Sequence, residues 1–207
     1  MKVFQELRAN FRLIPNQITA IRFFAVPVMW VVAYYEQFTY IGIGLIISLV
    51  TDLLDGAVAR KLNQTSDFGS KFDSISDQFI QLSALIWIVW LMPEIISENV
   101  FISLFAIATY FTSLLVGLVK FKRLANLHLY LSKVSGLFLY IFLIHAFMVG
   151  VYSYFLFMLA GILFILSSTE TIVLQSTRPN VDANVGSFFL QYVDDDHPIR
   201  AWLSRIP

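Results

Sequence analysis

Residues 51–77 read TDLLDGAVARKLNQTSDFGSKFDSISD, and this stretch decides the fold of the chain. It carries aspartates on two segments that are otherwise apolar and continue into runs long enough to span a membrane. A carboxylate in hydrocarbon costs about 3 kcal/mol or more, so several of them close together require counter-charge. The sequence therefore predicts a charged site between two membrane helices.

Two groups of residues in this stretch recur at helical spacing. The first group, at i, i+3, i+4 and i+7, is Asp52, Asp55, Gly56 and Ala59. The second group, at i, i+4 and i+8, is Gly69, Asp73 and Asp77. The polar residues at 63–67 predict a turn that makes the two helices antiparallel neighbours. We therefore expect the four carboxylates to meet across one helix pair.

The donor atoms of this expected site are carboxylate oxygens, with no Cys or His in the stretch. Oxygen ligands select hard cations, which predicts Mg²⁺ or Mn²⁺. Two ions about 3.5 to 4 Å apart would clamp a diphosphate. Arg60 would close the site with a guanidinium suited to phosphate. The alternative is a set of structural ion pairs, for which the stretch supplies only Arg60, Lys61 and Lys71.

The spacing of these residues resembles a known signature. Their pattern is Asp-x2-Asp-Gly-x2-Ala-Arg-x8-Gly-x3-Asp-x3-Asp, as in the CDP-alcohol phosphotransferase (phosphatidyltransferase) family. The stretch from Pro15 through Arg22 also resembles the Pro-Asn-x2-Thr-x2-Arg segment of bacterial phosphatidyltransferases. The resemblance implies transfer of a phosphatidyl group from CDP-diacylglycerol to an alcohol, with release of CMP.

Roles for individual residues follow from this resemblance and the expected geometry. The predicted metal ligands are Asp52, Asp55, Asp73 and Asp77. Asp77 is also the predicted catalytic base that takes the proton of the acceptor. The residues predicted to contact or make room for the nucleotide are Asp52, Gly56, Ala59, Arg60 and Gly69.

The acceptor is left open by the sequence. Arg123 and Lys133 belong to a second basic cluster that could bind an acceptor phosphate, although a bias of basic residues toward one side of the membrane explains them equally well. Gln78 follows Asp77 where many relatives carry Lys, which weakens an assignment to the glycerophosphate branch. The candidates are glycerol 3-phosphate, inositol or inositol phosphate, serine and phosphatidylglycerol.

The rest of the chain is that of an all-α polytopic membrane protein. Of its 207 residues 58% are hydrophobic and 14% charged, and the mean hydropathy is +0.74. Six apolar runs approach the roughly 20 residues that a bilayer requires: 19–35, 40–59, 68–91, 100–119, 132–150 and 152–174. Residues 1–14 read as an amphipathic helix on the membrane surface. We expect a membrane domain over 1–175 and a cytosolic tail over 176–207.

Basic residues predict the orientation. The connections around 35–39, 92–99 and 149–153 contain no Lys or Arg, so by the positive-inside rule both termini and the aspartates face the cytoplasm. A bacterial inner membrane is the expected location, with membrane lipids as partners. Because the basic residues lie at membrane boundaries, we expect no nucleic-acid partner.

Two other functions and one assembly state were weighed. An aspartate-rich prenyl-diphosphate transferase also binds a metal diphosphate between helices, but typically has more spans and differently spaced acids. A divalent-cation transporter would use intramembrane carboxylates along a path from both faces, whereas these acids cluster near one. A homodimer is implied by the family likeness, and Gly42 and Gly44 would permit close helix contact.

Overall fold

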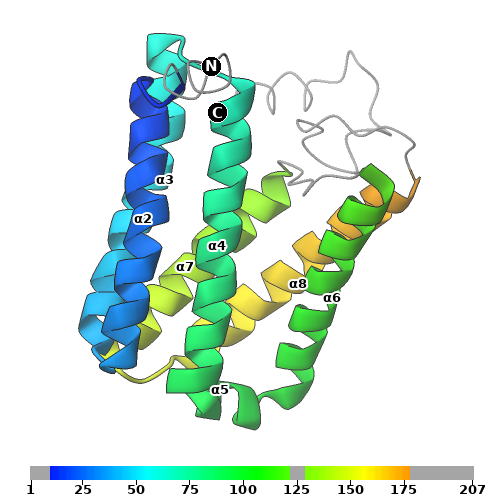
Figure 1. Ribbon diagram of the computed structural model, residues 1–207. Coiled ribbons are helices and arrows are strands. Elements are labelled where there is room, and N and C mark those ends of the chain that lie inside the picture. The colour runs from blue at the N-terminus through cyan, green and yellow to red at the C-terminus, as the bar shows by residue number, and fades with distance from the viewer. Residues whose placement is uncertain (1–9, 122–128, 178–207) are drawn as a thin grey trace. The chain divides into compact units, whose positions relative to one another are not determined.

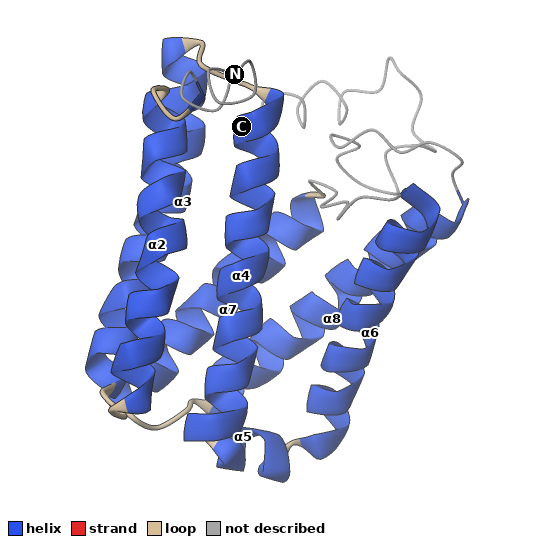
Figure 2. Ribbon diagram, viewed as in Figure 1, coloured by secondary structure: helices blue, strands red, loops and turns tan. Residues whose placement is uncertain are grey.

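The fold was analysed in a computed structural model, which describes residues 10–121 and 129–177. Within these two ranges all regular structure is helical (Figure 2). Most of the expected surface helix at 1–14, the tail beyond 177 and Arg123 lie outside the described residues. The expectation of an all-α fold is confirmed.

Seven helices are described, and six of them are long and apolar enough to cross a membrane. They are α2 (Ile14–Tyr34), α3 (Phe38–Leu62), α4 (Asp67–Leu91), α5 (Pro93–Glu98), α6 (Val100–Phe121), α7 (Tyr130–Val149) and α8 (Tyr154–Thr177). The six long helices correspond one to one with the six predicted spans. The short α5 was not predicted, and it begins at a proline, which suits the first turn of a helix.

The start of α2 differs most from the prediction. The helix begins at Ile14 rather than near residue 19, because Pro15 is accommodated in its first turn. The amide of Ile14, which has no partner within the helix, donates to Oε1 of Gln64 at 3.1 Å. The turn after α3 therefore caps a helix that lies 50 residues earlier in the chain.

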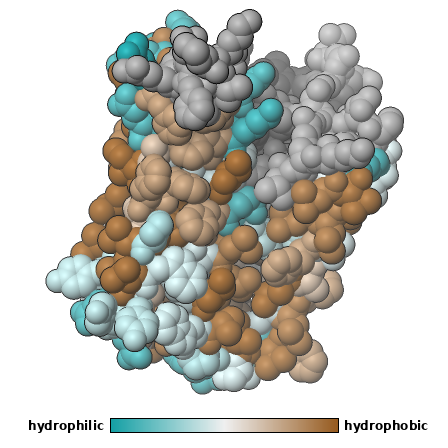
Figure 3. All heavy atoms as spheres, viewed as in Figure 1, coloured by the Kyte–Doolittle hydropathy of each residue, from teal (hydrophilic) through white to brown (hydrophobic). Residues whose placement is uncertain are grey.

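The chain forms two compact units, of which the first comprises residues 1–100 and 140–157. Within it α2 packs against both α3 and α4 (Figure 1). The buried side of α2 includes Val26, Met29 and Ala33. Its opposite side exposes large apolar side chains, namely Ile21, Phe24, Val28 and Val31. In Figure 3 the surface over α2 and α3 is mostly hydrophobic between two more polar ends, which fits contact with lipid.

The glycines considered for a dimer contact are used inside the first unit. A Cβ atom on Gly42 would lie 2.7 Å from Cγ of Met148, and one on Gly44 would lie 2.9 Å from Cε of Met29. Both glycines therefore allow close packing within one chain. The expectation of a homodimer stays a prediction, without support from these two residues.

The second unit comprises residues 101–139 and 158–207, and its described part contains most of α6 and α8 with the start of α7. Gly161 lies against Ile102, and the rings of Tyr110 and Phe164 are 5.6 Å apart. Nζ of Lys120 donates to the carbonyl oxygens of Gln175 at 2.5 Å and Ser176 at 3.0 Å. This cation binds the last carbonyls of α8, where a positive charge is favourable.

Candidate active site

The turn between α3 and α4 sets the geometry of the site. Asn63 ends α3 in the left-handed conformation with φ of 52°, which Asn adopts more readily than most residues. Ser66 then caps α4, because its Oγ accepts a hydrogen bond from the amide of Gly69 at 3.0 Å. The four-residue connection reverses the direction of the chain, so α4 runs antiparallel to α3 while α2 packs against both (Figure 1).

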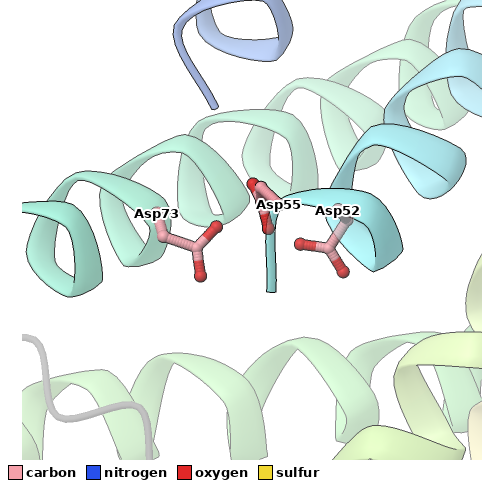
Figure 4. Close-up of side chains that lie close together, drawn as sticks. All are labelled: Asp52, Asp55 and Asp73. Carbon is pink, nitrogen blue, oxygen red and sulfur yellow. The ribbon is translucent and has the colours of Figure 1, made fainter. Parts of the chain in front are cut away.

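Three aspartates meet across this helix pair. Asp52 and Asp55 extend from α3 and Asp73 from α4 (Figure 4). One carboxylate oxygen from each lies within 4.8 Å of the other two. Asp55 is buried, whereas about a third of the side chains of Asp52 and Asp73 is exposed. The face that helical spacing predicted is therefore assembled.

Arg22 of α2 lies among the same carboxylates and was missed as their counter-charge. Its guanidinium forms ion pairs with Asp52 and Asp73, and its Nη2 lies 3.4 Å from Oδ2 of Asp55 and 3.4 Å from Oδ1 of Asp77. The Arg22 side chain is 0% exposed. One buried cation thus contacts all four predicted metal ligands, so counter-charge comes in part from a helix outside the stretch 51–77.

Thr19 holds the most buried of these acids. Its Oγ1 lies 2.8 Å from Oδ2 of Asp55 and 3.1 Å from the carbonyl oxygen of Pro15, one helical turn earlier. The hydroxyl donates its proton to the carboxylate, because a charged acceptor makes the stronger hydrogen bond. Thr19 and Arg22 together fix Asp55 from the α2 side.

A signal for this α2 face was present in the sequence. Asn16, Thr19 and Arg22 are polar residues at i, i+3 and i+6 in a span that is otherwise apolar, and all three are buried. A polar stripe of this kind in a membrane helix indicates partners inside the protein. The same three residues belong to the Pro15–Arg22 segment that resembles bacterial phosphatidyltransferases, but this resemblance did not assign them to the aspartates.

The small residues of the motif differ in their surroundings. A Cβ atom on Gly69 would collide with Oδ1 of Asn16, whose Nδ2 is anchored to the carbonyl of Asn10 at 2.8 Å. Gly69 therefore permits the close approach of α2 to α4. Within the described part of the chain, a Cβ atom on Gly56 would meet only Nη1 of Arg60, at 3.5 Å, so the tip of the exposed Arg60 lies near Gly56. Room beside the acids exists at Gly56 rather than at Gly69.

The other predicted site residues are less defined. Ala59, one turn from the acids on α3, is partly exposed. Lys133 is exposed near the start of α7 in the second unit, and its role stays a prediction. Lys61 and Lys71 are exposed, as expected for residues that mark a membrane boundary.

The donor set fits a divalent cation. When all four carboxylates are ionised they carry a charge of −4 and Arg22 contributes +1, which leaves a formal charge of −3 in one place. The ligand atoms are all carboxylate oxygens, the type that Mg²⁺ and Mn²⁺ prefer. The partly exposed side chains of Asp52, Asp73 and Asp77 are open to a ligand.

Known proteins resemble this chain over its membrane helices. A relative from Wigglesworthia glossinidia brevipalpis named CDP-diacylglycerol--glycerol-3-phosphate 3-phosphatidyltransferase is 38% identical over 80 residues, which is 37% of this chain and 43% of the relative. A Drosophila melanogaster protein named probable cardiolipin synthase (CMP-forming) is 34% identical over 107 residues, 47% of this chain and 33% of the relative.

These matches span less than half the length of each curated relative. No solved structure shows a significant match. The family model described as CDP-alcohol phosphatidyltransferase matches residues 12–174, a range that begins just before α2 and contains Arg22 and the four aspartates. The chain therefore belongs to the CDP-alcohol phosphatidyltransferase family.

Proposed function

We propose that this protein is a membrane enzyme that transfers a phosphatidyl group from CDP-diacylglycerol to an alcohol. The observation that carries the proposal is the set of four aspartates from α3 and α4 gathered in one place, within the range that the family model matches. Such a site suits a substrate that carries a diphosphate, because its remaining negative charge binds the cations that a diphosphate also binds.

The reaction exchanges a phosphoanhydride bond for a phosphoester bond. The hydroxyl oxygen of the acceptor forms a bond to the phosphorus that carries diacylglycerol, and the bond from this phosphorus to the oxygen of CMP breaks. CMP leaves with the bonding electrons, and the proton of the acceptor passes to a base. Positioning and charge neutralisation supply most of the rate enhancement in such transfers.

We assign the predicted roles to the observed positions. Asp52, Asp55 and Asp73 would hold the divalent cations, with Asp77 completing the set. Bound Mg²⁺ or Mn²⁺, as one ion or two, would neutralise the diphosphate and stabilise the departing CMP. Asp77 is 30% exposed and next to the other three acids, so its carboxylate can accept the proton of an incoming hydroxyl.

The nucleotide would bind on the α3 side of the acids. The open space at Gly56 and the guanidinium of Arg60 support this position, since a planar guanidinium recognises phosphate with two parallel hydrogen bonds. Ala59 adds another small side chain there, and Asp52 would contact the same ligand. Gly69 contributes indirectly, because it lets α2 reach the site.

The acceptor is proposed from the names of the relatives. Several are named for glycerol 3-phosphate as acceptor and one as a cardiolipin synthase. Glycerol 3-phosphate is therefore the first acceptor to test and phosphatidylglycerol the second, with Lys133 and Arg123 as proposed phosphate contacts. The distribution of Lys and Arg supports a site on the cytoplasmic side of a bacterial inner membrane.

The test is release of CMP from labelled CDP-diacylglycerol by the purified protein in mixed micelles with Mg²⁺ or Mn²⁺. One acceptor of the panel should increase the release far above the rate without acceptor. Asp77→Asn should lower the rate by about 10²- to 10⁴-fold, because a general base contributes that much. Lys71→Gln, an exposed change on the same helix, should keep it.

Folded protein that releases no CMP with any acceptor would contradict the proposal. A prenyl-diphosphate transferase and a cation transporter both predict this negative outcome. The family match supports neither of these two alternatives.

A further inference from the structure

Arg22 contacts the same carboxylates that a metal ion would need. Its two closest ion pairs are with Asp52 and Asp73, which are two of the three residues whose oxygens lie within 4.8 Å of one another. A carboxylate oxygen in contact with a guanidinium has less capacity to bind a cation, and the guanidinium repels the cation as well. Arg22 and a metal ion therefore compete for these two carboxylates.

The contacts of Arg22 stabilise the acidic site when no metal is bound. Four carboxylates so close together repel one another strongly away from bulk water, because the effective dielectric constant there is low. Arg22 lies eight residues after the start of α2 and is fully buried, so it supplies positive charge where solvent does not. With it, α2, α3 and α4 stay joined in the acidic region before metal arrives.

The contacts of Arg22 are also incomplete. Its Nε is buried and has no hydrogen-bond partner among the described residues. A buried donor without a partner costs free energy, so the observed position of the guanidinium is not its best possible hydrogen-bonding state. Moving away from Asp52 and Asp73 thus costs less than leaving a fully satisfied network.

We propose that Arg22 is an internal cation that holds the acidic site together without metal and is displaced from Asp52 and Asp73 when metal binds. The proposal rests on the metal-binding part of the proposed function. Arg22 is in this sense a positioning residue, which sets both the stability of the metal-free protein and the affinity of the metal site.

The test compares Arg22→Gln and Arg22→Lys with wild type and with Lys71→Gln as the matched control. Thermal unfolding in EDTA measures the stability of the metal-free protein in detergent, and Mn²⁺ titration followed by electron paramagnetic resonance measures metal affinity without substrate. The control removes an exposed cation from α4 and should change neither quantity.

Arg22→Gln should lower the Tm in EDTA by about 5 °C or more, since losing a buried partner charge is strongly destabilising. It should also bind Mn²⁺ roughly tenfold more tightly, because one repelling charge is gone. Added Mn²⁺ should therefore raise its Tm more than that of wild type. Arg22→Lys keeps the charge without the planar fork and should retain most of the wild-type Tm and affinity.

Other outcomes overturn the proposal. An unchanged Tm in EDTA for Arg22→Gln would show that Arg22 does not hold the site, and equal or weaker Mn²⁺ binding by the folded variants would show that it does not compete. If Arg22→Gln does not fold even with Mn²⁺, Arg22→Lys becomes the test. A more than tenfold lower affinity of Arg22→Lys for Mn²⁺ would then contradict competition between Arg22 and the metal. If wild type binds no Mn²⁺, the metal-binding part of the proposed function is wrong, and the proposed displacement of Arg22 is wrong with it.

Discussion

The two ends of α4 lie near polar contacts that differ in kind and in surroundings. Near its start, buried Arg22 joins four aspartates from α3 and α4. Beyond its end, the hydroxyl of Tyr152 donates to Glu98, and Nδ2 of Asn99 donates to this hydroxyl at 3.2 Å. The second set is open to water, which replaces a lost partner, while the first set depends on the protein alone.

The largest difference between the two ends should appear when α2 is pushed away from α4. Gly69→Ala places a Cβ atom against Oδ1 of Asn16, whose side chain is anchored to Asn10, so the backbone must shift. We expect about 1 to 3 kcal/mol of destabilisation, as for other overpacked sites, together with loss of CMP release. Thermal unfolding and the CMP assay measure the two effects.

Gly136→Ala is the matched control for this change. Among the residues that the structure describes, nothing lies within 4 Å of a Cβ atom at this position in α7. Alanine in a helix interior is favoured over glycine by up to about 1 kcal/mol, so this variant should be as stable as wild type or more so. A Gly69→Ala protein with wild-type stability and activity would show that the approach of α2 does not matter to the site.

A smaller effect is expected from the hydroxyl that holds Asp55. Thr19→Val keeps the shape and removes the donor to the carboxylate at 2.8 Å. A hydrogen bond to a charged group contributes about 1.5 to 3 kcal/mol, and part of this is recovered by Arg22. Thr19→Ser keeps the donor and should restore most of the loss in thermal unfolding. Equal stability of the Val and Ser variants would contradict the assigned hydrogen bond between Thr19 and Asp55.

The smallest effect should come from the end open to water. Donation by the hydroxyl to the carboxylate of Glu98 raises the pKa of Tyr152 above its usual value of 10.0, because ionisation would place two negative charges together. This contact stabilises fully below pH 10 and is lost as the pH rises through the raised pKa.

Tyr152→Phe should therefore cost less than about 0.5 kcal/mol at neutral pH, as surface substitutions usually do. Its difference from wild type in thermal unfolding should stay constant between pH 6 and 9 and shrink above pH 10. A loss of stability at pH 7 as large as that of Gly69→Ala would show that the contacts at the two ends of α4 do not differ in their contribution.

Much of this contrast was predictable from the sequence. Asp52, Asp55 and Asp73 share faces because helical periodicity is a local property, and the polar turn at 63–66 reverses the chain between α3 and α4. The expected direct packing of α3 on α4 was wrong, because α2 packs against both helices and joins them. The six spans followed from the length of the apolar runs, with ends that moved by up to five residues at Ile14.

The parts that were missed depend on contacts between distant segments. Periodicity could have placed Arg22 on a polar stripe of α2, but no local property of the sequence shows that this stripe faces the aspartates rather than another helix. The cap of α2 by Gln64 and the fit of Asn16 against Gly69 are likewise products of tertiary packing. Gly42 and Gly44 show the same limit, because small residues permit close helix contact but do not identify the helix that packs against them.

The position of Arg22 bears on how the protein is made. Asp52 and Asp73 follow it in the chain by 30 and 51 residues, more than the roughly 20 residues of one span. During synthesis α2 thus leaves the ribosome before the acids that compensate its buried cation, and a bilayer resists such a charge. We expect this helix to wait beside the insertion machinery until its acidic partners emerge, so that the three helices enter the lipid together.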